Sequence, residues 1–102
     1  MSVDVAGGDD ALRIWFSVNL PGTLFGSAGD DTLFGGNAGE MIIGGSGDDW
    51  LAGDDGDDTL RGEGGDDNLE GGAGADHFSG GSGHDRALVS DDDTHEGVEE
   101  VR

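Results

Sequence analysis

The sequence predicts an all-β fold: a right-handed parallel β-helix with 18 residues per coil and an N-terminal capping segment. Three observations predict it. A nine-residue period holds from Gly26 to Leu88 without insertion or deletion, the eighth position of every copy is apolar, and six turn-forming residues precede three strand-forming residues. Two copies therefore make one coil, which consists of a turn, a short strand, a second turn and a second strand.

Composition limits both the fold and the partners. The 102 residues have room for one domain, and a hydrophobic fraction of 32% is low for an ordinary core. There are 24 acidic residues against four arginines, with no lysine and no cysteine, so the formal net charge is -20. Such a polyanion repels nucleic acid and attracts cations. No segment has the roughly 20 apolar residues of a membrane span, and we expect no N-terminal signal peptide.

Three zones follow one another along the chain. Residues 1–25 contain a dense apolar stretch and are predicted to form a first strand and a cap. Residues 26–88 are seven nonapeptide copies that form the β-helix. Residues 89–102 are predicted to close it with a last short strand that includes Val98 and Val101. Composition alone would also suit a disordered chain, but the strict register favours a β-helix with ions bound and disorder without them.

The sixth position of every copy is acidic, and the residues are Asp31, Glu40, Asp49, Asp58, Asp67, Asp76 and Asp85. Copies on the same edge of the β-helix are two repeats apart, so acids 18 residues apart face each other across neighbouring coils. Facing carboxylates at about the strand spacing of 5 Å repel each other strongly. A hard divalent cation removes this repulsion, and calcium suits best because it accepts six to eight oxygens in flexible geometry. The pairs are Asp31/Asp49, Asp49/Asp67 and Asp67/Asp85 on one edge, and Glu40/Asp58 and Asp58/Asp76 on the other.

Copies three to six, from Gly44 to Ser79, carry the pattern most clearly. They resemble the repeats-in-toxin (RTX) family of hemolysin-type calcium-binding nonapeptide repeats. The resemblance implies a β-roll with about five Ca²⁺ ions, each held by two of the acids and by backbone carbonyls of the facing turns. Carried over by position, these carbonyls come from residues one and three of the earlier turn and residues two and four of the later turn. Positions one and three are Gly26, Ala28, Gly35, Asn37, Gly44, Ser46, Gly53, Asp55, Gly62 and Gly64. Positions two and four are Gly45, Gly47, Asp54, Gly56, Glu63, Gly65, Gly72, Gly74, Gly81 and Gly83.

Several copies depart from this pattern. Glutamate at position 40 is one methylene longer than aspartate, so the Glu40/Asp58 site is predicted to be the weakest. Side chains at Asp54 and Glu63 are expected to point to solvent. Ala87 barely fills the apolar column, so the array should fray there unless the C-terminal segment caps it. The fifth-position acids either raise the local calcium concentration or only solvate the turns, and they are Asp30, Asp48, Asp57 and Asp66.

Other signals are weaker. The three histidines, His77, His84 and His95, occupy outward, turn or loop positions, and no catalytic motif supports them, so we expect no enzyme. The acidic loop of residues 91–96 resembles an EF-hand loop only in its acidity. We interpret it as a solvated turn, with an additional ion as the alternative.

The leading functional hypothesis is a non-catalytic calcium-binding module that folds on binding extracellular Ca²⁺. The resemblance implies a bacterial protein that is secreted or displayed at the cell surface through type I secretion, and that carries further domains. The alternative is an adhesion module that binds a glycan or a protein through outward aromatics such as Trp50 and Phe34. A disordered calcium buffer is a third hypothesis. End-to-end self-association is plausible if either cap fails, because both ends of a short β-helix expose strand edges.

Overall fold

The structure is a computed structural model, and it describes residues 2–4, 7–8, 11–13, 22–36, 38–89, 92–98 and 100–101. These residues contain short strands joined by turns, and no helix. The strands are β1 (Ser2–Asp4), β2 (Ala11–Arg13), β3 (Thr23–Phe25), β4 (Thr32–Phe34), β5 (Met41–Gly45), β6 (Trp50–Ala52), β7 (Thr59–Glu63), β8 (Asn68–Glu70), β9 (His77–Ser79), β10 (Arg86–Leu88), β11 (Thr94–Glu96) and β12 (Glu100–Val101).

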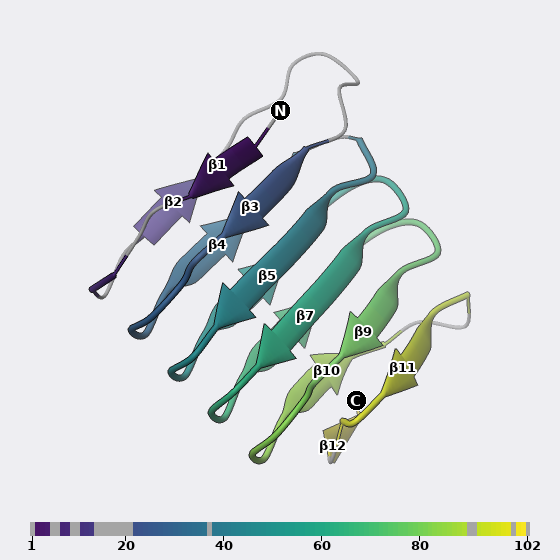
Figure 1. Cartoon of the computed structure of the whole chain (residues 1–102). Helices are drawn as coiled ribbons and strands as arrows, with labels where there is room; N and C mark the ends of the chain where they lie inside the picture. Colours follow the sequence, from purple (N-terminus) through teal and green to yellow (C-terminus); the bar gives the residue numbers. More distant parts are fainter. Residues whose placement is uncertain are drawn as a thin grey trace.

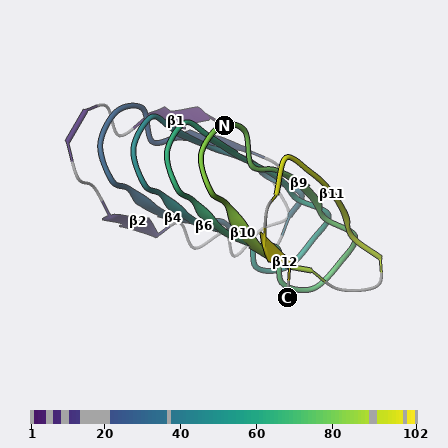
Figure 2. The same cartoon turned by 90° about the horizontal axis from the view of Figure 1, so that it is seen from below.

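The strands form two parallel sheets, and the chain crosses from one sheet to the other at every turn. Odd-numbered strands make one sheet in the order β1-β3-β5-β7-β9-β11, and even-numbered strands make the other in the order β12-β10-β8-β6-β4-β2. The strands succeed each other along the stack, and the two termini lie at opposite ends of it (Figure 1). Seen from below, the successive coils overlap as flattened loops (Figure 2). This is a β-solenoid, as the sequence predicts.

Strand register follows the sequence period. Within the repeats, paired residues are 18 apart, as in Leu24 with Ile42 and Leu51 with Leu69. The first coil is longer, since Val3 pairs with Leu24 at a separation of 21. Residues 1–25 therefore supply three strands, β1, β2 and β3, to the two sheets. The remainder of its apolar stretch, including Trp15 and Phe16, lies outside the described residues.

The core is a narrow double column of eighth-position side chains between the sheets. Strands alternate their side chains, so this position points inward while the seventh and ninth point outward. Fully burying a leucine contributes about 2 kcal/mol, and most of this column is leucine. Its members are Leu24, Leu33, Ile42, Leu51, Leu60, Leu69, Phe78 and Ala87.

The C-terminal segment covers the last repeat. Strand β11 pairs with β9, and β12 pairs with β10 through Val101 and Ala87. Val98 packs against the core without belonging to a strand, so the predicted last strand includes Val101 alone of the two valines. Ala87 is 2% exposed. Strand β12 thus lies beside Ala87 at the end of the array. The role of residues 89–102 as a cap stays a prediction.

Candidate metal centre

The sixth-position acids stand in two columns along the turns, one on each edge of the solenoid. In each predicted pair, the backbone N–H of the earlier acid donates to a carboxylate oxygen of the acid 18 residues later. On the first edge, Asp31 donates to Asp49, Asp49 to Asp67 and Asp67 to Asp85, at 2.8, 2.8 and 2.9 Å. On the second, Glu40 donates to Asp58 and Asp58 to Asp76, at 2.8 and 2.7 Å. The structure therefore brings all five predicted pairs together.

All seven acids are buried, with exposed fractions of 0 to 2%. Their second carboxylate oxygen is the informative atom. In Asp49, Asp58, Asp67, Asp76 and Glu40, this oxygen is buried and has no hydrogen-bond partner among the described residues. A buried carboxylate that is neither paired nor bound to a cation costs several kcal/mol of folding free energy. Each column therefore offers oxygen atoms that require a cation or a proton.

The pKa values show the same requirement. Burial raises the pKa of Asp58 and Asp67 to about 8 and that of Asp49 to about 7, from an ordinary value of 3.8. A backbone hydrogen bond opposes this rise, and carboxylates on adjacent coils add to it. Burial also raises the pKa of Glu40 and Asp76. Without a cation, burial therefore favours the protonated form of Asp58 and Asp67 at neutral pH.

The first-position glycines leave room for the carboxylates. A Cβ added at Gly44 would lie 2.5 Å from Oδ2 of Asp49, and one added at Gly26 would lie 2.7 Å from Oδ2 of Asp31. These carboxylate oxygens thus pack against the first glycine of their own turn. Any larger residue at this position would displace the carboxylate.

The turn carbonyls point into the gaps between coils. The carbonyl oxygen of Ser27, at position two, faces Gly45 on the next coil, and that of Gly29, at position four, faces Gly47. The first-position carbonyl of Gly44 instead points back to Gly26. Positions two and four of the earlier turn and position one of the later turn therefore face the same gap. For positions one, two and four this direction is opposite to the allocation carried over by position, because sequence position alone does not tell which way a carbonyl points along the stack. The set of carbonyls that hold an ion stays a prediction.

The same arrangement repeats along the array. Asp54 and Glu63 have φ of 67° and 70° and exposed side chains, and their carbonyls face Gly72 and Gly81 on the following coils. Their side chains point to solvent as expected. Among the described residues, no point gathers three or more acidic, histidine or cysteine side chains around one ion. Two carboxylates and several carbonyls per gap form an all-oxygen donor set, which is the kind that calcium prefers.

Glu40 differs from the aspartates. Its Oε1 accepts the N–H of Gly36 within its own turn at 2.5 Å, and its Oε2 is buried. The additional methylene lets the side chain fold back onto its own backbone. This contact occupies one of its oxygens, as the N–H of Asp31 occupies Oδ1 of Asp49. The weaker site at the Glu40/Asp58 gap stays a prediction.

The fifth-position acids have a role that sequence analysis missed. Oδ1 of Asp30 accepts the N–H of Asp48 at 2.8 Å, and Oδ1 of Asp48 accepts that of Asp66 at 2.8 Å. Asp57 and Asp66 accept N–H groups in the same way from Ala75 and His84. These exposed side chains join each turn to the next one, in the direction opposite to the buried acids. The 18-residue spacing of acids at this position was the available signal.

The loop of residues 91–96, of which Asp91 lies outside the described residues, is only in part the solvated turn that the sequence predicts. Asp92 is exposed, whereas Oδ1 of Asp93 accepts the N–H of Asp76 at 2.8 Å and so continues the second acid column. Asp93 stands 17 residues after Asp76. The 18-residue spacing of the paired acids therefore points to Thr94 and misses Asp93.

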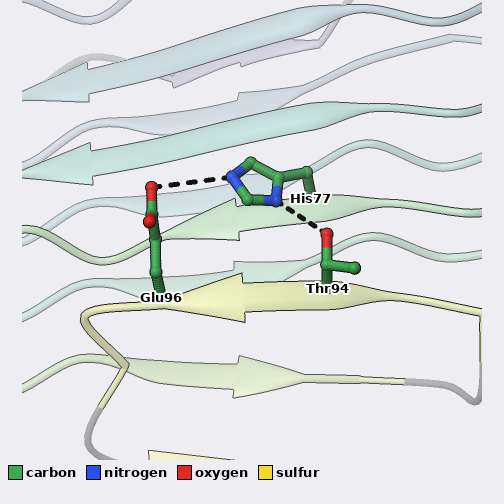
Figure 3. Close-up of polar contacts among 3 residues, drawn as sticks. All are labelled: His77, Thr94 and Glu96. Atoms are coloured by element: carbon green, nitrogen blue, oxygen red, sulfur yellow. Dashed lines mark hydrogen bonds and ion pairs between the residues drawn. The ribbon is translucent and has the colours of Figure 1, made fainter.

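The histidines and outward aromatics lie away from these columns. Nδ1 of His77 is 2.7 Å from Oγ1 of Thr94, and its Nε2 is 3.7 Å from Oε1 of Glu96 (Figure 3). These contacts join β9 to β11 on the outer face. Trp50 is 51% exposed beside a hollow of about 210 Å³, which Phe34 does not line. Phe34 and Trp50 lie on β4 and β6, which are neighbouring strands of the even-numbered sheet.

The fold and the acid columns define a class: a parallel β-solenoid whose turns present buried, oxygen-rich gaps for hard cations. The family model described as RTX calcium-binding nonapeptide repeat (4 copies) matches residues 22–51, 34–69 and 53–87. These matches together span most of the chain, and the chain belongs to this family. Its repeats are calcium-binding structural modules. Comparisons with curated proteins and with solved structures gave no match. No helix of the described residues is long and apolar enough to cross a membrane.

Proposed function

We propose that this chain is a non-catalytic module that folds when calcium fills the gaps between its coils. The observation that supports it best is a set of buried carboxylate oxygens that have no hydrogen-bond partner within the described part of the chain. They belong to Glu40, Asp49, Asp58, Asp67 and Asp76. In the absence of cations, ionised carboxylates in this arrangement oppose the coiled state, and a bound divalent cation reverses the sign of that contribution. The ordered state therefore depends on calcium.

Five ions would occupy the five repeat gaps, one for each acid pair. Each would be held by the two paired acids, by the second- and fourth-position carbonyls of the earlier turn and by the first-position carbonyl of the later turn. Five divalent ions would change the net charge from -20 to about -10. A module of this kind binds calcium with a dissociation constant of about 0.1 to 1 mM. At about 1 mM free calcium, each site then contributes about 0.4 to 1.4 kcal/mol, so several sites must fill together.

With this affinity, the calcium concentration around the chain would determine whether the chain is folded. Extracellular calcium fills such sites, whereas submicromolar cytosolic calcium leaves them empty. The chain would thus be extended inside a bacterial cell and compact after type I secretion, where it would support an attached domain. Export through this route and a place outside the cell belong to the proposal.

Far-UV circular dichroism tests this function. In chelator at pH 7.5 we expect the spectrum of an unfolded chain, and in about 10 mM calcium that of a β structure. Magnesium is the control ion because it demands a tighter octahedral geometry. An identical spectrum in chelator and calcium would contradict the proposal. Ion uptake without a gain of β structure would favour a disordered calcium buffer instead.

A further inference from the structure

The second acid column does not end with the repeats. In the array, a sixth-position carboxylate accepts the N–H of the acid one coil earlier, as Asp76 does from Asp58 at 2.7 Å. Asp93 repeats this contact one coil further on, since its Oδ1 accepts the N–H of Asp76 at 2.8 Å. The residue lies in the loop after the last repeat, beyond the residues that match the family model.

The backbone around Asp93 also repeats the geometry of the array. Thr94 N–H donates to the carbonyl of Asp76 at 2.9 Å, just as His77 N–H donates to that of Asp58 at 2.8 Å. Thr94 pairs with His77 in the sheet formed by β9 and β11. The His77 imidazole adds side-chain contacts to Thr94 and Glu96 on the outer face (Figure 3). The terminal coil therefore holds Asp93 in register with the column, although the loop lacks the repeat motif.

The gap between Asp76 and Asp93 has the same kinds of oxygen donors as the repeat gaps. Asp76 is 2% exposed, and its Oδ2 is buried without a hydrogen-bond partner among the described residues. Gly72 and Gly74 occupy positions two and four of the turn that leads to Asp76, with φ of 82° and 105°. At these positions one coil earlier, carbonyls face the next coil, since those of Asp54 and Gly56 point at Gly72 and Gly74. Because φ is positive at both pairs of positions, we expect the carbonyls of Gly72 and Gly74 to point in the same direction along the stack.

We propose a sixth cation site, for calcium, between Asp76 and Asp93, with the carbonyls of Gly72 and Gly74 as further ligands. This inference rests on the proposed function, because it assigns to the terminal coil the ion chemistry proposed for the repeats. Asp93 is partly exposed, so this site is more open to water than the interior gaps. The ion would fasten β11 to the edge of β9 with which it pairs and thereby couple closure of the C-terminal end to calcium.

The test counts bound ions in the full chain by native mass spectrometry in calcium. Asp93→Asn keeps an oxygen that can accept the Asp76 N–H but removes the charge, and Asp92→Asn is the matched control because Asp92 is exposed on the same loop. We expect one ion fewer in Asp93→Asn than in the wild type, and no loss in Asp92→Asn. Equal counts in Asp93→Asn and the wild type would overturn the proposal.

A second measurement serves if Asp93→Asn fails to fold in calcium. Anomalous diffraction from wild-type crystals grown in calcium should place a peak between Asp76 and Asp93 in addition to those in the repeat gaps. Peaks in the repeat gaps alone would reject the sixth site and leave the proposed function intact. Ordered coils without peaks in any gap would reject the proposed function itself.

Discussion

Asp67→Asn should lower the stability of the calcium-loaded module more than an ordinary surface change would. Asp67 stands in the middle of the first acid column, where its Oδ1 accepts the N–H of Asp49 and its own N–H donates to Asp85. It is 1% exposed and belongs to two neighbouring gaps. Asparagine retains an acceptor for the Asp49 amide but removes one negative charge from both gaps. The substitution therefore separates the charge from the hydrogen bond.

The magnitude follows from the number of gaps. With a dissociation constant of about 0.1 to 1 mM, each site contributes about 1.4 to 2.7 kcal/mol at about 10 mM free calcium. Loss of two sites should lower the free energy of unfolding by about 3 to 5 kcal/mol under these conditions. In chelator the sign reverses, because the substitution removes one of the repelling carboxylates from a metal-free column.

Urea unfolding in calcium, followed by circular dichroism, measures this change, and a calcium titration gives the midpoint of folding. Asp66→Asn is the matched control, since Asp66 is exposed, and asparagine can still accept the N–H of His84. We expect the control to stay within about 0.5 kcal/mol of the wild type. If Asp67→Asn behaves like the control and binds as many ions as the wild type, the reasoning about shared gaps is wrong.

Three further predictions test other parts of the structure. Glu40→Asp should lower the calcium concentration at the folding midpoint, because the shorter side chain cannot fold back onto Gly36 as Glu40 does; an unchanged or higher midpoint in a calcium titration would count against the weak-site assignment. Leu60→Ala should lower the free energy of unfolding in calcium by about 2 to 5 kcal/mol, since Leu60 is fully buried in the apolar column. Urea unfolding measures this change, and a loss below about 1 kcal/mol would mean that burial of the apolar column contributes little to stability. The pKa values of Asp58 and Asp67 are raised from 3.8 to about 8 in the metal-free coil, so the coiled state binds more protons than the unfolded state between these values. In chelator the coiled state should therefore be most stable at and below about pH 4 and lose stability steadily as the pH rises from about 4 to about 8, so that little of this stability remains at pH 7.5. Circular dichroism between pH 5 and 8.5 checks this, and more β structure at the alkaline end would contradict the sign.

Much of the architecture was predictable because period and chemistry coincide. Glycine at position one, an acid at position six and an apolar residue at position eight recur every nine residues, which sets the coil length, the core column and the acid pairs. Leu60 and Asp58, for example, have the predicted neighbours Phe78 and Asp76. Strict repetition made long-range contacts readable from spacing alone.

The remaining features depend on geometry that spacing does not encode. The direction of a carbonyl, such as that of Ser27 toward Gly45, is set by the φ and ψ angles of the turn. Asp93 joins the column although the chain there is one residue shorter than a full coil, and a period cannot anticipate that change. The exposed aspartate at position 48 resembles any solvated charge until the neighbouring amide of Asp66 is placed beside it.

The most direct test of the central claim is the size of the chain by small-angle X-ray scattering, with and without calcium, at pH 7.5. The coiled chain has a Cα radius of gyration of 12.0 Å, whereas an unfolded chain of this length has one of about 32 Å. If divalent ions between the acid columns hold the coils together, the radius should be close to the unfolded value in chelator and fall toward the compact value in calcium. A chain that is equally compact in chelator, or that stays expanded in calcium, would contradict this account.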